Sequence, residues 1–195
     1  MTLSPHLRPS SLPVGADGQA APARFRFAPT FIIDLIFSLA YVALFAREWA
    51  RARHGLPVAV GAGCFAIALA LCYAGKVAII GFLNQRGGDA RTYVISSGLV
   101  TTGLYAYSRN PTYLLTLVQC CLWSALLAFL QVFAPFAPLD CVATALLPAA
   151  FFLITDSWII AREDSALRAA HPDQFDAYCA RVGRWFGRKR GAGAA

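Results

Sequence analysis

The sequence predicts an all-α integral membrane protein with about four transmembrane helices, a cytoplasmic loop and a C-terminal amphipathic helix. The first observation behind this prediction is composition. Of the 195 residues, 58% are hydrophobic and 14% are charged, whereas a soluble domain carries about 25% charged residues. The second observation is that the apolar residues gather in long stretches with few charges. A helix needs about 20 such residues to cross the hydrocarbon core of a bilayer.

Four stretches have this length and composition, and they are residues 27–46, 56–83, 112–139 and 141–161. Three of them contain one internal charge each: Asp34, Lys76 and Asp156. An ionisable group inside a span usually faces the helix bundle or a wet cavity. Pro135 and Pro138 indicate a tight turn, so the last two stretches are predicted to form a helical hairpin.

The two ends of the chain differ from its apolar middle. Residues 1–26 are rich in Pro, Ser, Ala and Gly, so they are predicted to be a disordered tail. Residues 187–195 are predicted to be a basic flexible tail. After the fourth stretch, apolar residues recur near helical spacing up to Trp185, which predicts an amphipathic helix near the membrane face, interrupted at Pro172. Residues 27–186 are therefore expected to form one domain.

Basic residues predict the orientation of the spans, because cytoplasmic loops carry an excess of Lys and Arg. Residues 135–140 contain none, residues 84–109 contain three, and the segment from Arg162 onward contains seven. The loop before the third stretch and the C-terminus are therefore expected on the cytoplasmic side. Three arginines within residues 47–53 would then lie outside, against the rule.

Several classes of function are not indicated. The net charge of +7 comes from loops and end segments rather than from one basic stripe, so nucleic-acid binding is not predicted. The six cysteines and three histidines do not cluster at metal-ligand spacing, so no metal site is predicted. Gly61 and Gly63 lack the third glycine and the preceding strand of a dinucleotide-binding loop, so they are interpreted as helix-packing residues.

Polar and aromatic residues precede the third apolar stretch. Asn110 and Pro111 are typical of the N-cap and first turn of a helix, but this interpretation leaves Arg109, Tyr105 and Tyr113 unexplained. A helix N-terminus offers free N–H groups and the positive end of the helix dipole, which suit an anionic group. Two hypotheses therefore remain: a simple helix start, or a binding site at the helix start.

Acidic residues follow the fourth apolar stretch. Glu163 and Asp164 are interpreted either as a solvated pair at the membrane boundary or as part of a binding site. In the second case a carboxylate faces back toward Pro111 and binds hydroxyl groups or an ammonium group of a cofactor. Asp156 lies seven residues before Glu163, which is the spacing of residues on one face of an α-helix.

Three short motifs occur in order within residues 95–186. Leu99–Tyr105 reads LVTTGLY, Arg109–Tyr113 reads RNPTY and Glu163–Leu167 reads EDSAL, followed by a basic and aromatic segment that ends at Trp185. In order and spacing these motifs resemble the signature of the integral-membrane methyltransferases that include isoprenylcysteine carboxyl methyltransferase and the phospholipid methyltransferases. That signature reads LVTSGxY, RHPxY, EExxL and FGxxYxxY. The first two apolar stretches contribute nothing to the resemblance.

The resemblance implies an activity, a cofactor and a set of site residues. The family binds S-adenosylmethionine (SAM) without a Rossmann fold, so a SAM pocket in residues 95–186 and methyl transfer to a lipid-like or small amphiphilic substrate are expected. The lipid bilayer is the expected partner, and the active site is expected to face the cytoplasm. By resemblance, SAM would be bound by Ser97, Gly98, Leu99, Val100, Tyr105, Asn110, Pro111, Thr112, Tyr113 and Glu163. Arg109 and Glu163 would be catalytic, and Arg162 and Asp156 would contact the substrate.

Two departures from the signature narrow this expectation. Asn110 replaces the family's histidine, although asparagine also forms hydrogen bonds. Ile159 stands where the prenylcysteine enzymes carry a substrate-binding arginine, so little methylation of prenylcysteine is expected.

Two alternatives remain open. One is an NADPH-dependent membrane reductase of the sterol and steroid reductase type, which shares a similar arginine-proline motif. Against it, Thr112 replaces the asparagine of that motif, and Leu114 and Leu115 replace Gly-Glu. The other alternative is a non-enzymatic membrane protein whose polar ends only stabilise helix termini.

Overall fold

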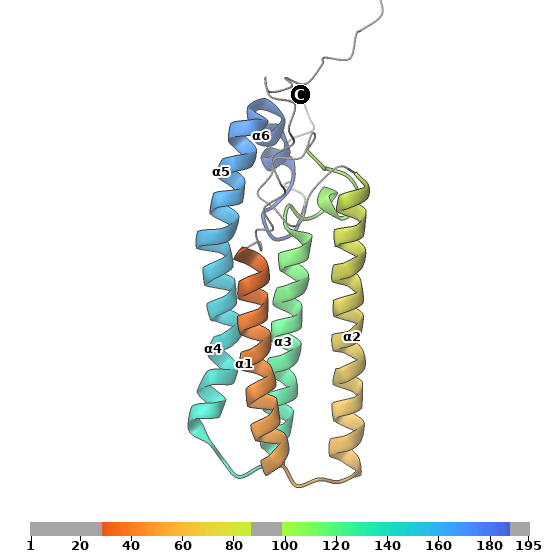
Figure 1. Cartoon of the computed structure of the whole chain (residues 1–195), viewed down its shortest axis with the longest axis vertical. Helices are drawn as coiled ribbons and strands as arrows, with labels where there is room; N and C mark the ends of the chain where they lie inside the picture. Colours follow the sequence, from red (N-terminus) through yellow and green to blue (C-terminus); the bar gives the residue numbers. More distant parts are fainter. Residues whose placement is uncertain (1–28, 87–98, 188–195) are drawn as a thin grey trace, which may run out of the picture.

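The long helices of the chain lie side by side as a bundle (Figure 1). The structure is a computed structural model that describes residues 29–86 and 99–187, with side chains from residue 32 onward. Within these ranges 83% of the residues are helical and there is no strand. The elements in chain order are α1 (Pro29–Arg51), α2 (Leu56–Gln85), η1 (Gly103–Ala106), α3 (Pro111–Val132), α4 (Pro138–Ile154), η2 (Thr155–Ile160), α5 (Ala161–Ala170) and α6 (Pro172–Arg181).

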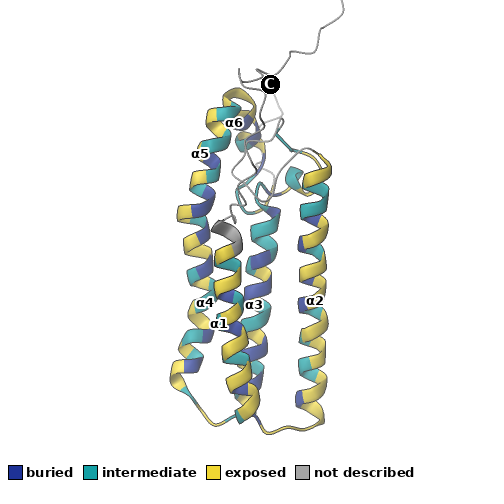
Figure 2. Cartoon of the chain, viewed as in Figure 1, coloured by how far each residue is buried: buried dark blue, intermediate teal, exposed yellow. Residues whose placement is uncertain are grey.

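In the described part of the chain, three helices are long and apolar enough to cross a membrane. They are α2, α3 and the continuous helix Pro138–Ala170, which joins α4, η2 and α5. Much of the outward surface of the bundle is exposed (Figure 2). Along α2 this surface carries large apolar side chains: Leu56, Val60, Ile67, Leu71 and Val77. The predicted all-α fold is therefore confirmed, and the three helices indicate a membrane protein; α1 is not one of the three.

The two ends of the bundle differ. One end carries a cap, which we define as residues 99–110, α5, α6 and residues 182–187; it lies at the top of Figure 1. The opposite end, which we call the far end, holds the α1–α2 connection and the turn between α3 and α4.

The hairpin of α3 and α4 is confirmed, because the two helices pack against each other. Its boundaries differ from the prediction: α3 ends at Val132 instead of near Leu139, and α4 begins at Pro138. Pro135 lies between them. Proline cannot donate a backbone hydrogen bond, and it disfavours the helical conformation of the residue before it.

The helix that begins α4 extends further than predicted. It passes the expected end at Ala161 and continues to Ala170, and residues 149–170 contain no glycine or proline that would stop it. The break expected at Pro172 is confirmed, because His171 separates α5 from α6.

The centre of the bundle is α3, which contacts α1, α2 and α4. On one side it contributes to a buried cluster of Phe37, Tyr41, Cys120, Leu127 and Phe151. On the other side it packs against α2 through Val58, Leu69, Leu126 and Leu130. A Cβ atom at Gly61 would overlap the ring of Phe129, so this glycine permits the close packing that the sequence indicated, whereas Gly63 faces open space.

A chain of hydrogen bonds crosses three helices at a proline inside α4. Pro148 has no N–H, so the carbonyl of Thr144, four residues earlier, lacks its helical donor. The Ser124 hydroxyl on α3 donates to this carbonyl at 2.8 Å. The Tyr41 hydroxyl on α1 lies 3.0 Å from the Ser124 oxygen. Ser124 therefore satisfies the carbonyl that Pro148 leaves without a donor, and Tyr41 contacts Ser124 from α1.

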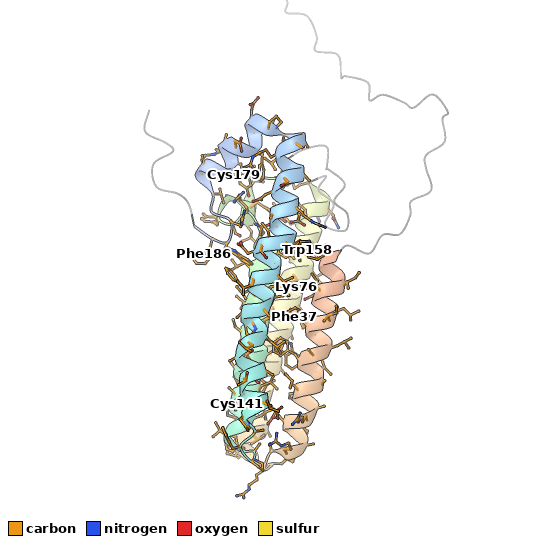
Figure 3. The ribbon with its side chains drawn as sticks, turned by 90° about the vertical axis from the view of Figure 1, so that its left-hand side faces the viewer. Phe37, Lys76, Cys141, Trp158, Cys179 and Phe186 are labelled. Atoms are coloured by element: carbon orange, nitrogen blue, oxygen red, sulfur yellow. The ribbon has the colours of Figure 1, made fainter. Side chains whose placement is uncertain are left out.

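A buried ion pair joins α1 to α2. Lys76 Nζ lies 2.7 Å from Oδ2 of Asp34, and Lys76 is buried. The same Nζ lies 3.5 Å from Oε1 of Gln119 on α3, whose Nε2 donates to the Tyr73 hydroxyl at 2.9 Å. Figure 3 places Lys76 near mid-height of the bundle, close to the level of Phe37. The internal charges of the first two predicted spans therefore neutralise each other.

Carboxylates at the far end bind two of the three arginines that conflict with the charge rule. Arg51 donates to Asp140 at 2.8 Å and to Glu48 at 3.1 Å, and its second terminal nitrogen donates to the Pro135 carbonyl at 2.7 Å. Arg47 lies 3.3 Å from Asp140. Both carboxylates are buried. The cluster also fastens the end of α1 to the start of α4.

Candidate functional site

Two parts of the chain that are far apart in the sequence meet in the cap. The Tyr178 hydroxyl donates to the Tyr105 carbonyl at 2.6 Å, and the backbone N–H of Arg109 donates to the Gly183 carbonyl at 3.1 Å. Leu99 packs against Phe175, Tyr178 and Val182. The loop before α3, helix α6 and the C-terminal segment therefore fold as one unit on the start of α3.

The glycine of the LVTTGLY motif has a structural reason. Gly103 has φ +63°, a left-handed conformation that other residues rarely adopt. A Cβ atom there would also lie 2.8 Å from the ring of Phe82 on α2. Gly103 begins η1, so the loop turns tightly against the end of α2 and returns to the start of α3.

Alternating charges connect the start of α3 to the C-terminal segment. Arg109 lies 3.3 Å from Asp164, and Asp164 lies 3.0 Å from Arg184. Arg184 also lies 3.2 Å from Asp156, which accepts a hydrogen bond from the Trp185 indole at 2.8 Å. Asp164 is buried, so the hypothesis of a solvated boundary pair is wrong for this residue.

Glu163 faces the start of α3 by a separate contact. The Tyr113 hydroxyl donates to Glu163 Oε1 at 2.7 Å. The two residues are 50 positions apart in the sequence and belong to two different motifs, RNPTY and EDSAL. Both acidic residues of EDSAL therefore point toward the region of Pro111, Glu163 through Tyr113 and Asp164 through Arg109.

The spacing argument for Asp156 fails because the helix changes its pitch. Residues 155–160 form a π-helix, η2, in which hydrogen bonds run from i to i+5. Each turn takes more residues than the 3.6 of an α-helix. Asp164 rather than Glu163 therefore shares Arg184 with Asp156, eight residues away instead of seven.

Asn110 occupies the N-cap position of α3, as predicted, but its side chain does not cap the helix. Its side chain makes no cap hydrogen bond, and Nδ2 donates instead to the Arg184 carbonyl at 3.0 Å. A capping residue usually has an extended backbone that aims its side-chain oxygen at the first turn, whereas Asn110 has ψ 58°. Its backbone N–H donates to Ser108 Oγ at 3.1 Å. Asn110 therefore holds the C-terminal segment against the helix start.

Burial keeps several groups of the cap in their neutral form. It raises the pKa of Tyr105 to about 12, and it also raises the pKa of Tyr178. Both phenols are therefore hydrogen-bond donors at neutral pH. Burial raises the pKa of Cys179 as well, and its sulfur accepts a hydrogen bond from the Arg109 guanidinium at 2.7 Å.

The structure brings most of the sequence-predicted residues together, but not all of them. Pro111 is buried, and Leu99, Val100, Tyr105 and Thr112 are half-buried beside the residues described above. Ser97 and Gly98 lie outside the described residues.

Arg162 and Ile159 stand apart from the charge cluster. Arg162 is exposed and its guanidinium lies 4.8 Å from the centre of the Trp158 ring. Ile159 is 2% exposed, so it is a core residue. The position that carries an arginine in the prenylcysteine enzymes is therefore occupied by packed hydrocarbon.

Sequence reasoning missed the two residues that organise the cluster. Asp164 and Arg184 each bind two partners of opposite charge. Arg184 had not been predicted as a site residue, and Asp164 had been considered only together with Glu163, with no partner assigned. A signal was present for Arg184, since it lies in the basic and aromatic segment that belongs to the family signature. For Asp164 the π-helix removed the spacing signal.

An apolar pocket of about 370 Å3 opens next to the charge cluster. It is lined by Leu114, Leu117, Phe152, Arg184, Trp185 and Phe186. The rings of Trp185 and Phe152 lie 5.0 Å apart, so the C-terminal segment closes over the groove between α3 and α4. Figure 3 shows Phe186 at about the height of Trp158, below Cys179. The pocket thus joins an apolar wall to ionic groups at the base of the cap.

Comparison with known proteins finds no matching protein-family model, no matching curated protein and no matching solved structure. Within the described residues, no three His, Cys, Asp or Glu side chains are grouped so that they could hold a metal ion.

Proposed function

We propose that this chain is a SAM-dependent membrane methyltransferase that acts on a lipid-like or small amphiphilic substrate at the cytoplasmic membrane face. One observation carries the proposal: the hydrogen bond of 2.7 Å between Tyr113 and Glu163. It joins two motifs that resemble the methyltransferase signature. In the third motif the Tyr105 carbonyl accepts a hydrogen bond from Tyr178, which lies in the aromatic segment that follows EDSAL.

The charged side chains at the base of the cap suit the cofactor. Among Glu163 and the residues of the ion-pair chain, three carboxylates (Asp156, Glu163 and Asp164) stand against two guanidinium groups (Arg109 and Arg184), which is an excess of one negative charge within this group. SAM carries a sulfonium, an ammonium and a carboxylate, and hence a net positive charge. A cluster with excess negative charge attracts such a ligand.

The proposed roles follow from these positions. SAM supplies an electrophilic methyl group when it is bound. Glu163 accepts hydrogen bonds from the cofactor's hydroxyl or ammonium groups, and its orientation is fixed by Tyr113. The rings of Tyr105 and Tyr113 stabilise the sulfonium through cation–π contact. The chain's contribution to methyl transfer is alignment of donor and nucleophile and exclusion of water.

The substrate is proposed to enter from the bilayer into the apolar pocket lined by Leu114, Leu117 and Phe152. Within the cap, Arg109 and Arg184 are already paired with carboxylates, and Ile159 is buried. Arg184 is the only basic residue among those that line the pocket, and it is already paired, so a neutral or cationic headgroup is favoured there over a prenylcysteine carboxylate.

In this proposal α1 is the fourth span. It spans 23 residues, and its charges are paired at both positions where they would meet lipid, at Asp34 and at Arg51. The cap and the C-terminus face the cytoplasm.

Binding of SAM to the purified full-length protein in detergent tests the proposal. A charged hydrogen bond contributes about 1.5–3 kcal/mol, so Glu163→Gln is expected to weaken SAM binding roughly tenfold to a hundredfold. The matched control is Asp176→Asn, which removes an exposed carboxylate of α6 that binds only Arg168 among the described residues. Equilibrium dialysis with labelled SAM measures both.

Two results would contradict the proposal. The wild-type protein fails to bind SAM, or folded Glu163→Gln protein binds it as tightly as wild type. Binding of NADPH in the same dialysis would favour the reductase alternative instead.

A further inference from the structure

Two helices carry the same aromatic–arginine pair at the level where the bundle meets the cap. On η2 and α5 the Arg162 guanidinium lies 4.8 Å from the centre of the Trp158 ring, four residues earlier. At the end of α2 the Arg86 guanidinium lies 4.9 Å from the centre of the Phe82 ring, again four residues earlier. Both arginines are exposed. In each pair the aromatic residue lies on the bundle side and the arginine lies toward the cap.

The surface on the bundle side of each pair is apolar. Leu153 and Ile154 are exposed before Trp158, and Val77 is exposed before Phe82. Trp158 itself is 47% exposed. Tryptophan concentrates at the interface between hydrocarbon and water in membrane proteins. Phe82 is half-buried at the end of α2. Long basic side chains next to such aromatic residues reach the headgroup layer while their stems stay on apolar surface.

Ion pairing distinguishes these arginines from most of the other basic residues. In the described ranges, the residues paired with a carboxylate are Arg47, Arg51, Lys76, Arg109, Arg168 and Arg184. The described basic residues outside that group are Arg53, Arg86, Arg162 and Arg181. Three of these four lie at the cap end and only Arg53 lies at the far end. The far end therefore presents little uncompensated positive charge despite its three arginines.

We infer that Arg86 and Arg162 bind the phosphate groups of anionic phospholipids in the leaflet at the cap end, and that Phe82 and Trp158 mark the depth at which the acyl chains begin. Guanidinium groups match phosphate oxygens in pairs of hydrogen bonds. Anionic lipid is the occupant because its headgroup, unlike a zwitterionic one, leaves an uncompensated negative charge for each arginine. The inference stands on the two ring contacts and the ion-pair pattern, and it does not require SAM.

Lipid preference of the full-length protein tests this inference. The purified protein is titrated with phosphatidylglycerol or with phosphatidylcholine of the same chains, and native mass spectrometry gives the ratio of the two binding constants. A basic residue near an anionic surface contributes about 1 kcal/mol, which corresponds to a roughly fivefold preference. Arg162→Gln and Arg86→Gln are each expected to lower the preference for phosphatidylglycerol roughly fivefold. Arg162→Lys keeps the charge and should keep most of the preference.

Arg168→Gln is the matched control, because it removes the same charge from the same helix α5. Arg168 is paired with Asp176 at 2.8 Å, and it lies six residues beyond Arg162, about 9 Å along a helix. That separation is comparable to the Debye length of about 8 Å at physiological salt. The preference of the Arg168→Gln protein for phosphatidylglycerol should therefore differ from that of wild type by less than twofold. The inference is overturned if Arg162→Gln or Arg86→Gln leaves the preference at the wild-type value. It is equally overturned if Arg168→Gln lowers the preference as much as they do, because only overall charge would then matter.

Discussion

Lys76→Met should be strongly destabilising, because it leaves Asp34 in the bundle without its cation. Removing one partner of a buried ion pair costs about 3–5 kcal/mol. The Asp34 side chain is 32% exposed, so the lower end of that range, about 3 kcal/mol, is expected for the free energy of unfolding. Gln119 loses a contact in the same variant, since Lys76 Nζ lies 3.5 Å from its Oε1.

The double variant Lys76→Met, Asp34→Leu separates pairing from packing. Replacing both charges by apolar groups of similar volume is often neutral or stabilising. The double variant should therefore recover to within about 1 kcal/mol of wild type, which makes it about 2 kcal/mol more stable than Lys76→Met alone. Reversible unfolding in mixed micelles of increasing SDS content, followed by circular dichroism, measures these free energies.

Arg168→Met provides the comparison for an exposed ion pair. Arg168 and Asp176 lie 2.8 Å apart, but their side chains are 53% and 60% exposed. Pairs of that kind contribute about 0–1 kcal/mol. The reasoning is refuted if Lys76→Met unfolds as easily as Arg168→Met, or if the double variant is no more stable than Lys76→Met alone.

Two further changes test individual hydrogen bonds in the same unfolding assay. Ser124→Ala should lower the free energy of unfolding by about 1–3 kcal/mol, because the buried Thr144 carbonyl loses its hydrogen-bond donor. In a Pro148→Ala background the loss should be smaller, since residue 148 then has an N–H that can donate to this carbonyl. An equal loss in both backgrounds would show that the Thr144 carbonyl is not the reason. Asn110→Ala should lower the free energy of unfolding by about 1 kcal/mol, because the hydrogen bond to the Arg184 carbonyl is lost. Proteolysis of the C-terminal segment should also accelerate. Unchanged stability and unchanged protection from the protease would mean that this hydrogen bond contributes nothing.

The helices could be predicted from the sequence because their signals are local. Uncharged length identified α2 and α3, and the prolines identified the turn between α3 and α4 and the break before α6. The end of α3 was placed too late because an apolar turn looks like apolar helix when only hydropathy is considered. For example, Phe133 and Phe136 lie in the turn although both are apolar.

The site could be predicted only in part, for two physical reasons. The motifs identified which residues meet, as with Tyr113 and Glu163. They did not identify Asp164 and Arg184 as the centre of the charge cluster, because ion pairs between distant segments leave no pattern in a single sequence. The role of Asn110 was misassigned because local sequence favours an N-cap there, whereas the C-terminal segment supplies a tertiary partner.

The number of arginines in each loop was also an incomplete guide to the orientation of the spans. The three arginines near residue 50 counted against the predicted orientation, yet Asp140, which binds Arg47 and Arg51, lies about 90 residues away in the chain. The ion pairs of Arg47 and Arg51 depend on tertiary structure, so they could not be read from the count of arginines along the sequence.

The π-helix at residues 155–160 changes the angle at which side chains before and after it leave the long helix from Pro138 to Ala170. Below it, Phe151 is directed into the bundle core; above it, Asp164 is directed to the arginines of the cap. In a continuous α-helix the direction of Phe151 would determine the direction of Asp164, because the angle between successive residues is constant. Loss of one residue from this segment would turn the whole upper part by about 100°, the angle between successive residues of an α-helix, and would present a different side chain to Arg184. The sequence above the π-helix is therefore free to change its contacts with the cap without any change in the way the lower part packs.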